Sequence, residues 1–204
     1  MSNRRPPGIP ALTALAFQSA IGVVGLVVIV LLDIPVPLLG HGLWHSLLWG
    51  AIGAALTYAG LLWCTRIPGL LPDTLERQMQ GLYDFAVSYS PAVLVCLSLL
   101  AGIGEELLFR GAVQGGLLMH TPAAVAVLGA SVLFGLVHWV SFTYFLIATG
   151  LGLILGVAYL LSESIVLVML WHAVYDVIAL FCLLRFPHWF GVRRIRRGGP
   201  GRQE

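Results

Sequence analysis

GEELLFRG, residues 104–111, places two adjacent carboxylates and an arginine inside an apolar run that extends from residue 91 to residue 119. The run contains no Asn or Asp, and no Pro after its first residue, so we predict one continuous helix through it. On insertion scales, an ionisable side chain at the centre of a membrane helix costs about 2.5–3.5 kcal/mol. Three such groups so close together indicate a cluster that is paired, functional or both.

The composition of the whole chain decides the class of protein. The 204 residues are 59% hydrophobic and 10% charged, and the mean hydropathy is +0.94. Soluble domains carry about 25% charged residues, so this composition excludes a water-soluble globular fold. We predict an all-α fold, a polytopic transmembrane bundle of about six helical spans. The three cysteines lack a C-x-x-C spacing and indicate neither a disulfide framework nor a thiolate metal site.

The pattern of apolar runs divides the chain into three regions. Residues 1–90 are predicted to be a two-span scaffold with a cytoplasmic interfacial loop, in which a surface helix begins near Asp73. Residues 91–184 are predicted to be a helical core that contains the charged stretch 104–111, and residues 185–204 a basic tail. The predicted spans cover residues 11–32, 43–62, 91–119, 123–139, 142–161 and 165–184.

Basic residues are unevenly distributed along the chain. All 11 are Arg, and the predicted loops 33–42, 120–122 and 162–164 contain none. By the positive-inside rule, we expect a multi-pass protein of the plasma or inner membrane with both termini in the cytoplasm. The basic tail, with Arg193 and Arg197, suggests contact with anionic lipid headgroups.

Three separated segments place ionisable side chains inside predicted spans: Glu105-Glu106-x-x-x-Arg110, Phe134-x-x-x-His138 and His172-x-x-x-Asp176. Residues four apart lie on one face of a helix, so each segment presents a pair. We predict that Glu106 and Arg110 pair along their own helix. Glu105 lies about 100° around that helix and stays available for another role.

These side chains are compatible with several chemistries. A carboxylate and a histidine that face one water form a general-base hydrolase, and a second histidine with a neighbouring polar group can stabilise an oxyanion. Alternatively, Glu105, His138 and His172 would hold a divalent metal such as zinc, whose bound water would be the nucleophile. The sequence lacks the H-E-x-x-H and G-x-S-x-G motifs of other hydrolase classes.

A non-catalytic protein is the alternative from a different class. Acid–histidine pairs also relay protons, which fits a proton-coupled carrier or a bacteriocin-immunity-type partner. Taken singly, Glu106–Arg110 fits a structural ion pair and His138 fits an interfacial histidine.

The three motifs, in this order, resemble those of the CPBP family of intramembrane proteases, the CAAX-processing and bacteriocin-processing (Abi/Rce1-like) enzymes. The resemblance covers residues 90–184 and includes the glycine-rich segment 148–156. It implies an intramembrane endopeptidase, glutamate-type or metallo-, that acts on a membrane-associated protein or peptide and on no nucleic acid. Prenylated C-termini, leader peptides and sorting signals are all substrates consistent with the family.

The resemblance also implies roles for individual residues. Glu105 and His138 would activate the hydrolytic water, His172 and residue 176 would stabilise the oxyanion, and Glu106, Arg110 and Phe134 would support the site. The family commonly has Asn where this chain has Asp176. A carboxylate donates to an oxyanion only when it is protonated, so this departure bears directly on the role of residue 176.

Overall fold

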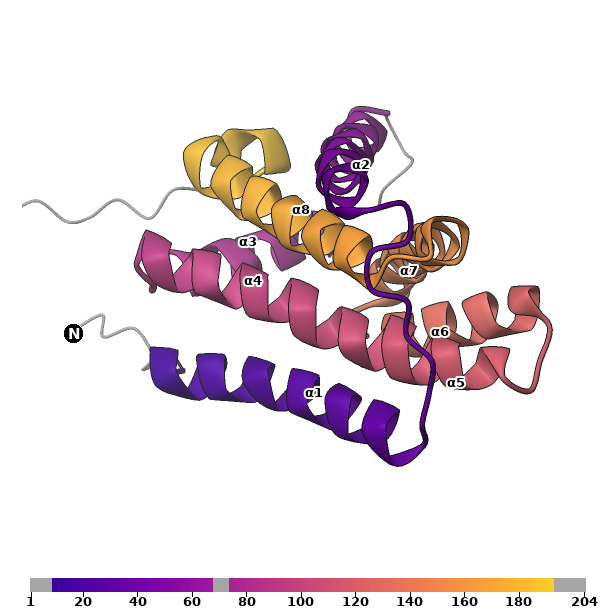
Figure 1. The fold of residues 1–204 in the computed structure, drawn as a ribbon. Coiled ribbons are helices and arrows are strands. Elements are labelled where there is room, and N and C mark those ends of the chain that lie inside the picture. The colour runs from indigo at the N-terminus through magenta and orange to yellow at the C-terminus, as the bar shows by residue number, and fades with distance from the viewer. Residues whose placement is uncertain (1–8, 68–73, 193–204) are drawn as a thin grey trace, which may run out of the picture.

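The computed structural model describes residues 9–67 and 74–192, and every regular element within them is a helix. This confirms the predicted all-α class (Figure 1). The elements are α1 (Ala11–Leu31), α2 (Leu43–Cys64), α3 (Thr74–Ala86), α4 (Pro91–Glu106), η1 (Leu107–Gln114), α5 (Gly115–Leu118), α6 (Ala123–Val137), α7 (Phe142–Ser162), α8 (Ile165–Arg185) and η2 (Pro187–Phe190).

Five helical segments are long and apolar enough to cross a membrane: Ala11–Leu31, Leu43–Cys64, Pro91–Leu118, Phe142–Ser162 and Ile165–Arg185. The remaining predicted span corresponds to α6, which is apolar but has only 15 residues. At 1.5 Å per residue, α6 is about 22 Å long, less than the roughly 30 Å of a hydrocarbon core. The six predicted spans are therefore five full-length helices and one short apolar helix.

The charged segment is helical throughout, as its lack of breakers predicts. α4, η1 and α5 follow one another without a gap from Pro91 to Leu118, and η1 is a π-helical stretch of 8 residues. Ser90 caps the start, where its hydroxyl accepts a hydrogen bond from the Val93 backbone nitrogen. π-Helical geometry is rare and frequently occurs at functional sites. Arg110 lies within it.

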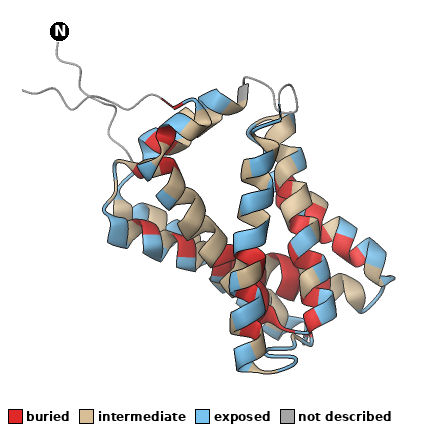
Figure 2. Cartoon of the chain, turned by 90° about the horizontal axis from the view of Figure 1, so that it is seen from above, coloured by how far each residue is buried: buried red, intermediate tan, exposed pale blue. Residues whose placement is uncertain are grey.

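α8 packs against both α2 and α4, while α1 lies along α4 and α6 pairs with α7 (Figure 1). The buried residues gather where these helices cross, and the outer faces are exposed (Figure 2). The glycine-rich segment 148–156 of α7 forms such a crossing. A Cβ atom on Gly152 would lie 3.1 Å from the Ser131 Cα atom of α6, so the glycine allows α6 and α7 to approach each other closely.

The predicted surface helix is α3, which begins at Thr74; Asp73 itself lies outside the described residues. Its apolar face packs against the end of α8 and the η2 segment, through Met79, Leu82, Tyr83, Leu183, Phe190 and Val192. α3 therefore lies at the end of the bundle where η2 follows α8. Residues 1–8 and 193–204, which include the arginines of both predicted cytoplasmic termini except Arg185, also lie outside the described residues.

Candidate active site

The site forms where α4 crosses α8 at close range. A Cβ atom on Gly102 would lie 2.6 Å from the Ala173 backbone nitrogen, so the two helix backbones nearly touch at this point. Glu105 and Glu106 lie one turn further along α4, and His172 directly precedes Ala173 on α8. This crossing explains how two motifs that are more than 60 residues apart come into contact.

Glu106 and Arg110 form the predicted ion pair, with 2.8 Å between Arg110 Nη1 and Glu106 Oε1. Both side chains are buried, at 0% and 1% exposure. The pair is also tied to other helices. Arg110 Nη2 donates to the Gly152 carbonyl of α7 at 2.9 Å, and the guanidinium lies 4.9 Å from the Phe134 ring centroid of α6. Glu106 Oε1 additionally accepts a 2.7 Å hydrogen bond from His172 Nδ1.

Glu105 points away from that pair, as its position on the helix predicts. Its Oε1 atom accepts a 2.7 Å hydrogen bond from the Gln18 side-chain amide of α1. Its Oε2 atom is buried, has no hydrogen-bond partner among the described residues, and lies 3.5 Å from His138 Nε2 and 4.0 Å from His172 Nε2. The two carboxylate oxygens thus have different surroundings. Oε1 is held by the Gln18 amide, and Oε2 faces the imidazoles of His138 and His172.

His138 lies just beyond the end of α6, because the helix ends at Val137 and not at Trp139 as predicted. The His138 backbone nitrogen donates to the Gly135 carbonyl, three residues earlier, instead of to the Phe134 carbonyl four residues earlier. The Phe134 carbonyl is therefore available to another donor. The His138 Nδ1 atom donates to that carbonyl at 2.8 Å. The bond assigns the proton to Nδ1 and leaves Nε2 to accept a proton on the side of Glu105.

His172 and Asp176 also come together with this group. His172 Nε2 lies 3.8 Å from Asp176 Oδ2, which is beyond hydrogen-bond distance. The Asp176 side chain is 30% exposed, whereas that of His172 is 10% exposed. The structure therefore brings all four predicted catalytic side chains, Glu105, His138, His172 and Asp176, to one place.

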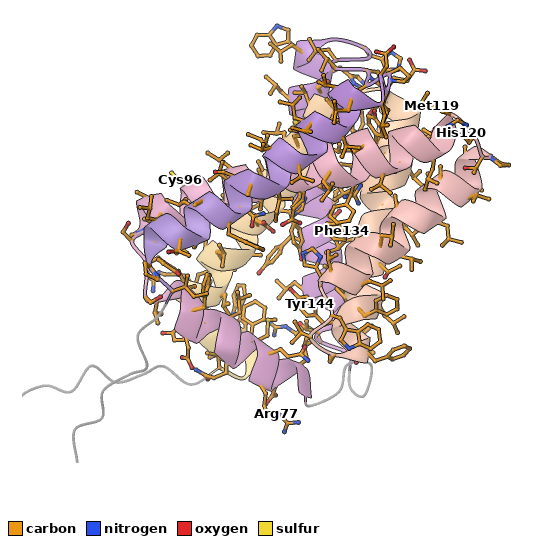
Figure 3. All side chains as sticks on the ribbon, turned by 90° about the horizontal axis from the view of Figure 1, so that it is seen from below. Arg77, Cys96, Met119, His120, Phe134 and Tyr144 are labelled. Carbon is orange, nitrogen blue, oxygen red and sulfur yellow. The ribbon has the colours of Figure 1, made fainter. Side chains whose placement is uncertain are left out.

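A cavity of about 1030 Å³ opens in front of these groups. Gln18, Glu105, His138, His172 and Asp176 all line it, together with mainly apolar side chains of α2, α3, α4, α7 and α8. Figure 3 shows Phe134 near the middle of the molecule, and Tyr144, which lines the same cavity, closer to α3. These polar side chains therefore lie in a largely apolar chamber that can hold more than a single water.

Glu105, His138 and His172 are the residues that the alternative, metal-dependent mechanism would use. Among residues 9–67 and 74–192, no three His, Cys, Asp or Glu side chains are arranged to hold a metal ion. Tetrahedral zinc with bonds of about 2.0–2.1 Å needs donor atoms roughly 3.4 Å apart. The 4.0 Å between His172 Nε2 and Glu105 Oε2 is longer. As these side chains lie in the structure, they are therefore not arranged as a tetrahedral zinc site.

Gln18 is the site residue that reasoning from the motifs missed. The available signal was an amide side chain inside an otherwise apolar predicted span, because a polar group there needs a partner. The spacing of the three motifs could not indicate that partner, since Gln18 lies 87 residues before Glu105.

Comparison with known proteins agrees with this geometry. A family model described as Type II CAAX prenyl endopeptidase Rce1-like matches residues 87–178, which contain the three motifs. No curated protein and no solved structure matches the chain. Residues 87–178 therefore form an Rce1-like type II CAAX prenyl endopeptidase (CPBP) family domain, which covers a little less than half of the chain.

Proposed function

We propose that this protein is an intramembrane endopeptidase that hydrolyses a peptide bond in a membrane-associated protein or peptide, with a water activated by Glu105 and His138. The observation that carries the proposal is the convergence of Glu105 Oε2, His138 Nε2 and His172 Nε2 at the wall of one cavity. The catalytic core is residues 91–184, and residues 1–90 act as its scaffold.

The base in this proposal is the pair of Glu105 and His138. A water between Glu105 Oε2 and His138 Nε2 would meet two proton acceptors, because His138 Nδ1 already donates to the Phe134 carbonyl. The water's proton goes to this pair as its oxygen attacks the peptide carbonyl. The proton then goes to the leaving amine, so that the C–N bond breaks and the pair returns to its starting state.

The oxyanion is stabilised from the α8 side. His172 Nδ1 donates to Glu106, which fixes the ring and turns Nε2 toward the cavity. In its protonated form His172 donates from Nε2 to the oxygen that gains charge, and Glu106 balances the imidazolium. Asp176, next to that position, donates only while it carries a proton.

The substrate in this proposal reaches the cavity from the membrane. The chamber is lined mainly by apolar side chains, which suits a peptide that carries an apolar or lipid-modified segment.

We place both termini in the cytoplasm because the arginine-free loops lie at the opposite ends of the long helices.

The decisive experiment is cleavage by purified full-length protein in proteoliposomes. Farnesylated and unmodified C-terminal peptides are incubated in water enriched in ¹⁸O, and the products are mapped by mass spectrometry. We expect cleavage with one ¹⁸O in the new carboxylate, no acyl-protein intermediate, and unchanged rates with 1,10-phenanthroline. A trapped acyl-protein would contradict direct attack by water. Activity that the chelator abolishes and zinc restores would contradict activation of that water by Glu105 and His138 alone.

Replacing Asp176 tests the oxyanion side. Asp176→Asn supplies an amide that donates without a proton from solvent, at a side chain that is already 30% exposed. We expect kcat within about tenfold of the wild-type value, measured on the peptide that wild type cleaves. A loss as large as that of Glu105→Gln would show that the negative charge of Asp176 is required.

A further inference from the structure

The N-terminal helix reaches into the site although it lies outside the residues that match the family. α1 is almost entirely apolar and outward-facing; of its residues only Gly25 is buried. Its Gln18 side chain nevertheless lines the cavity and donates from Nε2 to Glu105 Oε1 at 2.7 Å. A primary amide in a membrane helix is costly without a partner, and this one has a specific partner in the reactive group.

The packing of α1 against α4 and η1 fixes the position of Gln18 along α4. Gln18, Gly22 and Gly25 are at positions i, i+4 and i+7 and share one helical face. A Cβ atom on Gly22 would lie 3.0 Å from the Gly104 Cα atom, and one on Gly25 would lie 2.6 Å from the Leu108 backbone nitrogen. The backbones of α1 and of the segment 104–108 are thus in direct contact, which leaves Gln18 little freedom to shift along α4.

The consequence for Glu105 is a defined orientation. A carboxylate on a flexible side chain has two equivalent oxygens and several rotamers. With Oε1 held by Gln18, the other oxygen is directed at His138 Nε2 and His172 Nε2, at 3.5 and 4.0 Å. An amide can donate this bond without competing for the proton that the base must take up.

We propose that Gln18 is a positioning residue for the hydrolysis, which acts by anchoring Glu105 Oε1 so that Oε2 faces the attacking water. The role rests on the proposed function of Glu105. It makes α1 a component of the active site, beyond the Rce1-like segment 87–178.

The test compares three variants with wild type in the proteoliposome cleavage assay. Gln18→Met keeps the length of the side chain and removes the donor, Gln18→His keeps an N–H donor, and Ser19→Ala is the matched control. The Ser19 hydroxyl donates to the Leu15 carbonyl of its own helix, and the Ser19 side chain is exposed. Folded protein is quantified by size-exclusion chromatography before each assay.

We expect Gln18→Met to lower kcat about tenfold or more with little change in KM, because a hydrogen bond to a charged group is lost beside the reacting atoms. Gln18→His should retain more activity than Gln18→Met, and Ser19→Ala should match wild type. A role in packing alone predicts the reverse order, because methionine suits an apolar environment better than histidine.

The outcomes separate this inference from the proposed function. If Glu105→Gln is inactive while Gln18→Met has wild-type kcat, or if Gln18→His falls below Gln18→Met, the positioning role is overturned and the peptidase stands. If Glu105→Gln retains full activity, the proposed function fails, and the positioning role fails with it.

Discussion

Glu105→Gln is expected to lower kcat for peptide cleavage by about 10²–10⁴-fold, the usual contribution of a positioned general base. The amide has nearly the same size and still offers an oxygen to Gln18, so the 2.7 Å contact can be retained. It cannot take up the proton of a water between residue 105 and His138. The loss should therefore appear in turnover while the fold is preserved.

The measurement for Glu105→Gln is product formation by mass spectrometry in proteoliposomes, with thermal unfolding in detergent as a check on folding. Glu163→Gln is the matched control, because Glu163 is exposed at the turn between α7 and α8. Wild-type cleavage by Glu105→Gln would remove the base from the proposed mechanism. Proton-coupled solute flux that depends on Glu105, without peptide cleavage, would instead support a carrier.

The parts of the site that could be predicted are those set by helical periodicity and by the cost of charge in a membrane. The four-residue spacing placed Glu106 and Arg110 on one face, and the two form an ion pair at 2.8 Å. The cost of unpaired charge in lipid requires such groups to face protein or a cavity. This is why Glu105, His138 and His172, from three separate helices, were expected together, and they do line one cavity.

The parts that could not be predicted depend on which helices are neighbours. Periodicity gives the face of a helix but not the helix that covers it. The Gly152 carbonyl that accepts from Arg110, and the amide of Gln18 on α1, became visible only once the crossings were known. Likewise, hydropathy does not show where a short apolar helix ends. α6 ends at Val137, so His138 follows the helix instead of lying within it.

At residue 176, where this chain has Asp, the family resemblance and the structure give different information. The resemblance assigns an oxyanion role to a position where the family commonly has Asn. The structure places Asp176 Oδ2 at 3.8 Å from His172 Nε2, beside the cavity and partly exposed. That position is compatible with orienting His172 as well as with approaching a substrate, and only the Asn variant separates these roles.

Arg110→Met is expected to produce the largest loss of stability. Arg110 is 1% exposed, and its removal leaves the Glu106 carboxylate, at 0% exposure, without its cationic partner. Loss of one member of a buried ion pair costs about 3–5 kcal/mol, because the remaining charge stays desolvated. The Gly152 carbonyl and the face of Phe134 lose their contacts with the guanidinium as well.

Thermal unfolding in detergent measures this loss, and Arg77→Met on the exposed side of α3 is the matched control. The double variant Glu106→Gln, Arg110→Met should be more stable than Arg110→Met alone. In wild type, Glu106 Oε1 accepts a 2.7 Å hydrogen bond from His172 Nδ1, and the amide oxygen of Glu106→Gln can still accept it. In addition, the double variant leaves neither member of the ion pair as an unpaired buried charge. If the two substitutions were simply additive, the pair would not be coupled and the buried carboxylate would not be the source of the instability. Rescue of stability without rescue of cleavage would show that the charged pair of Glu106 and Arg110 serves cleavage as well as stability.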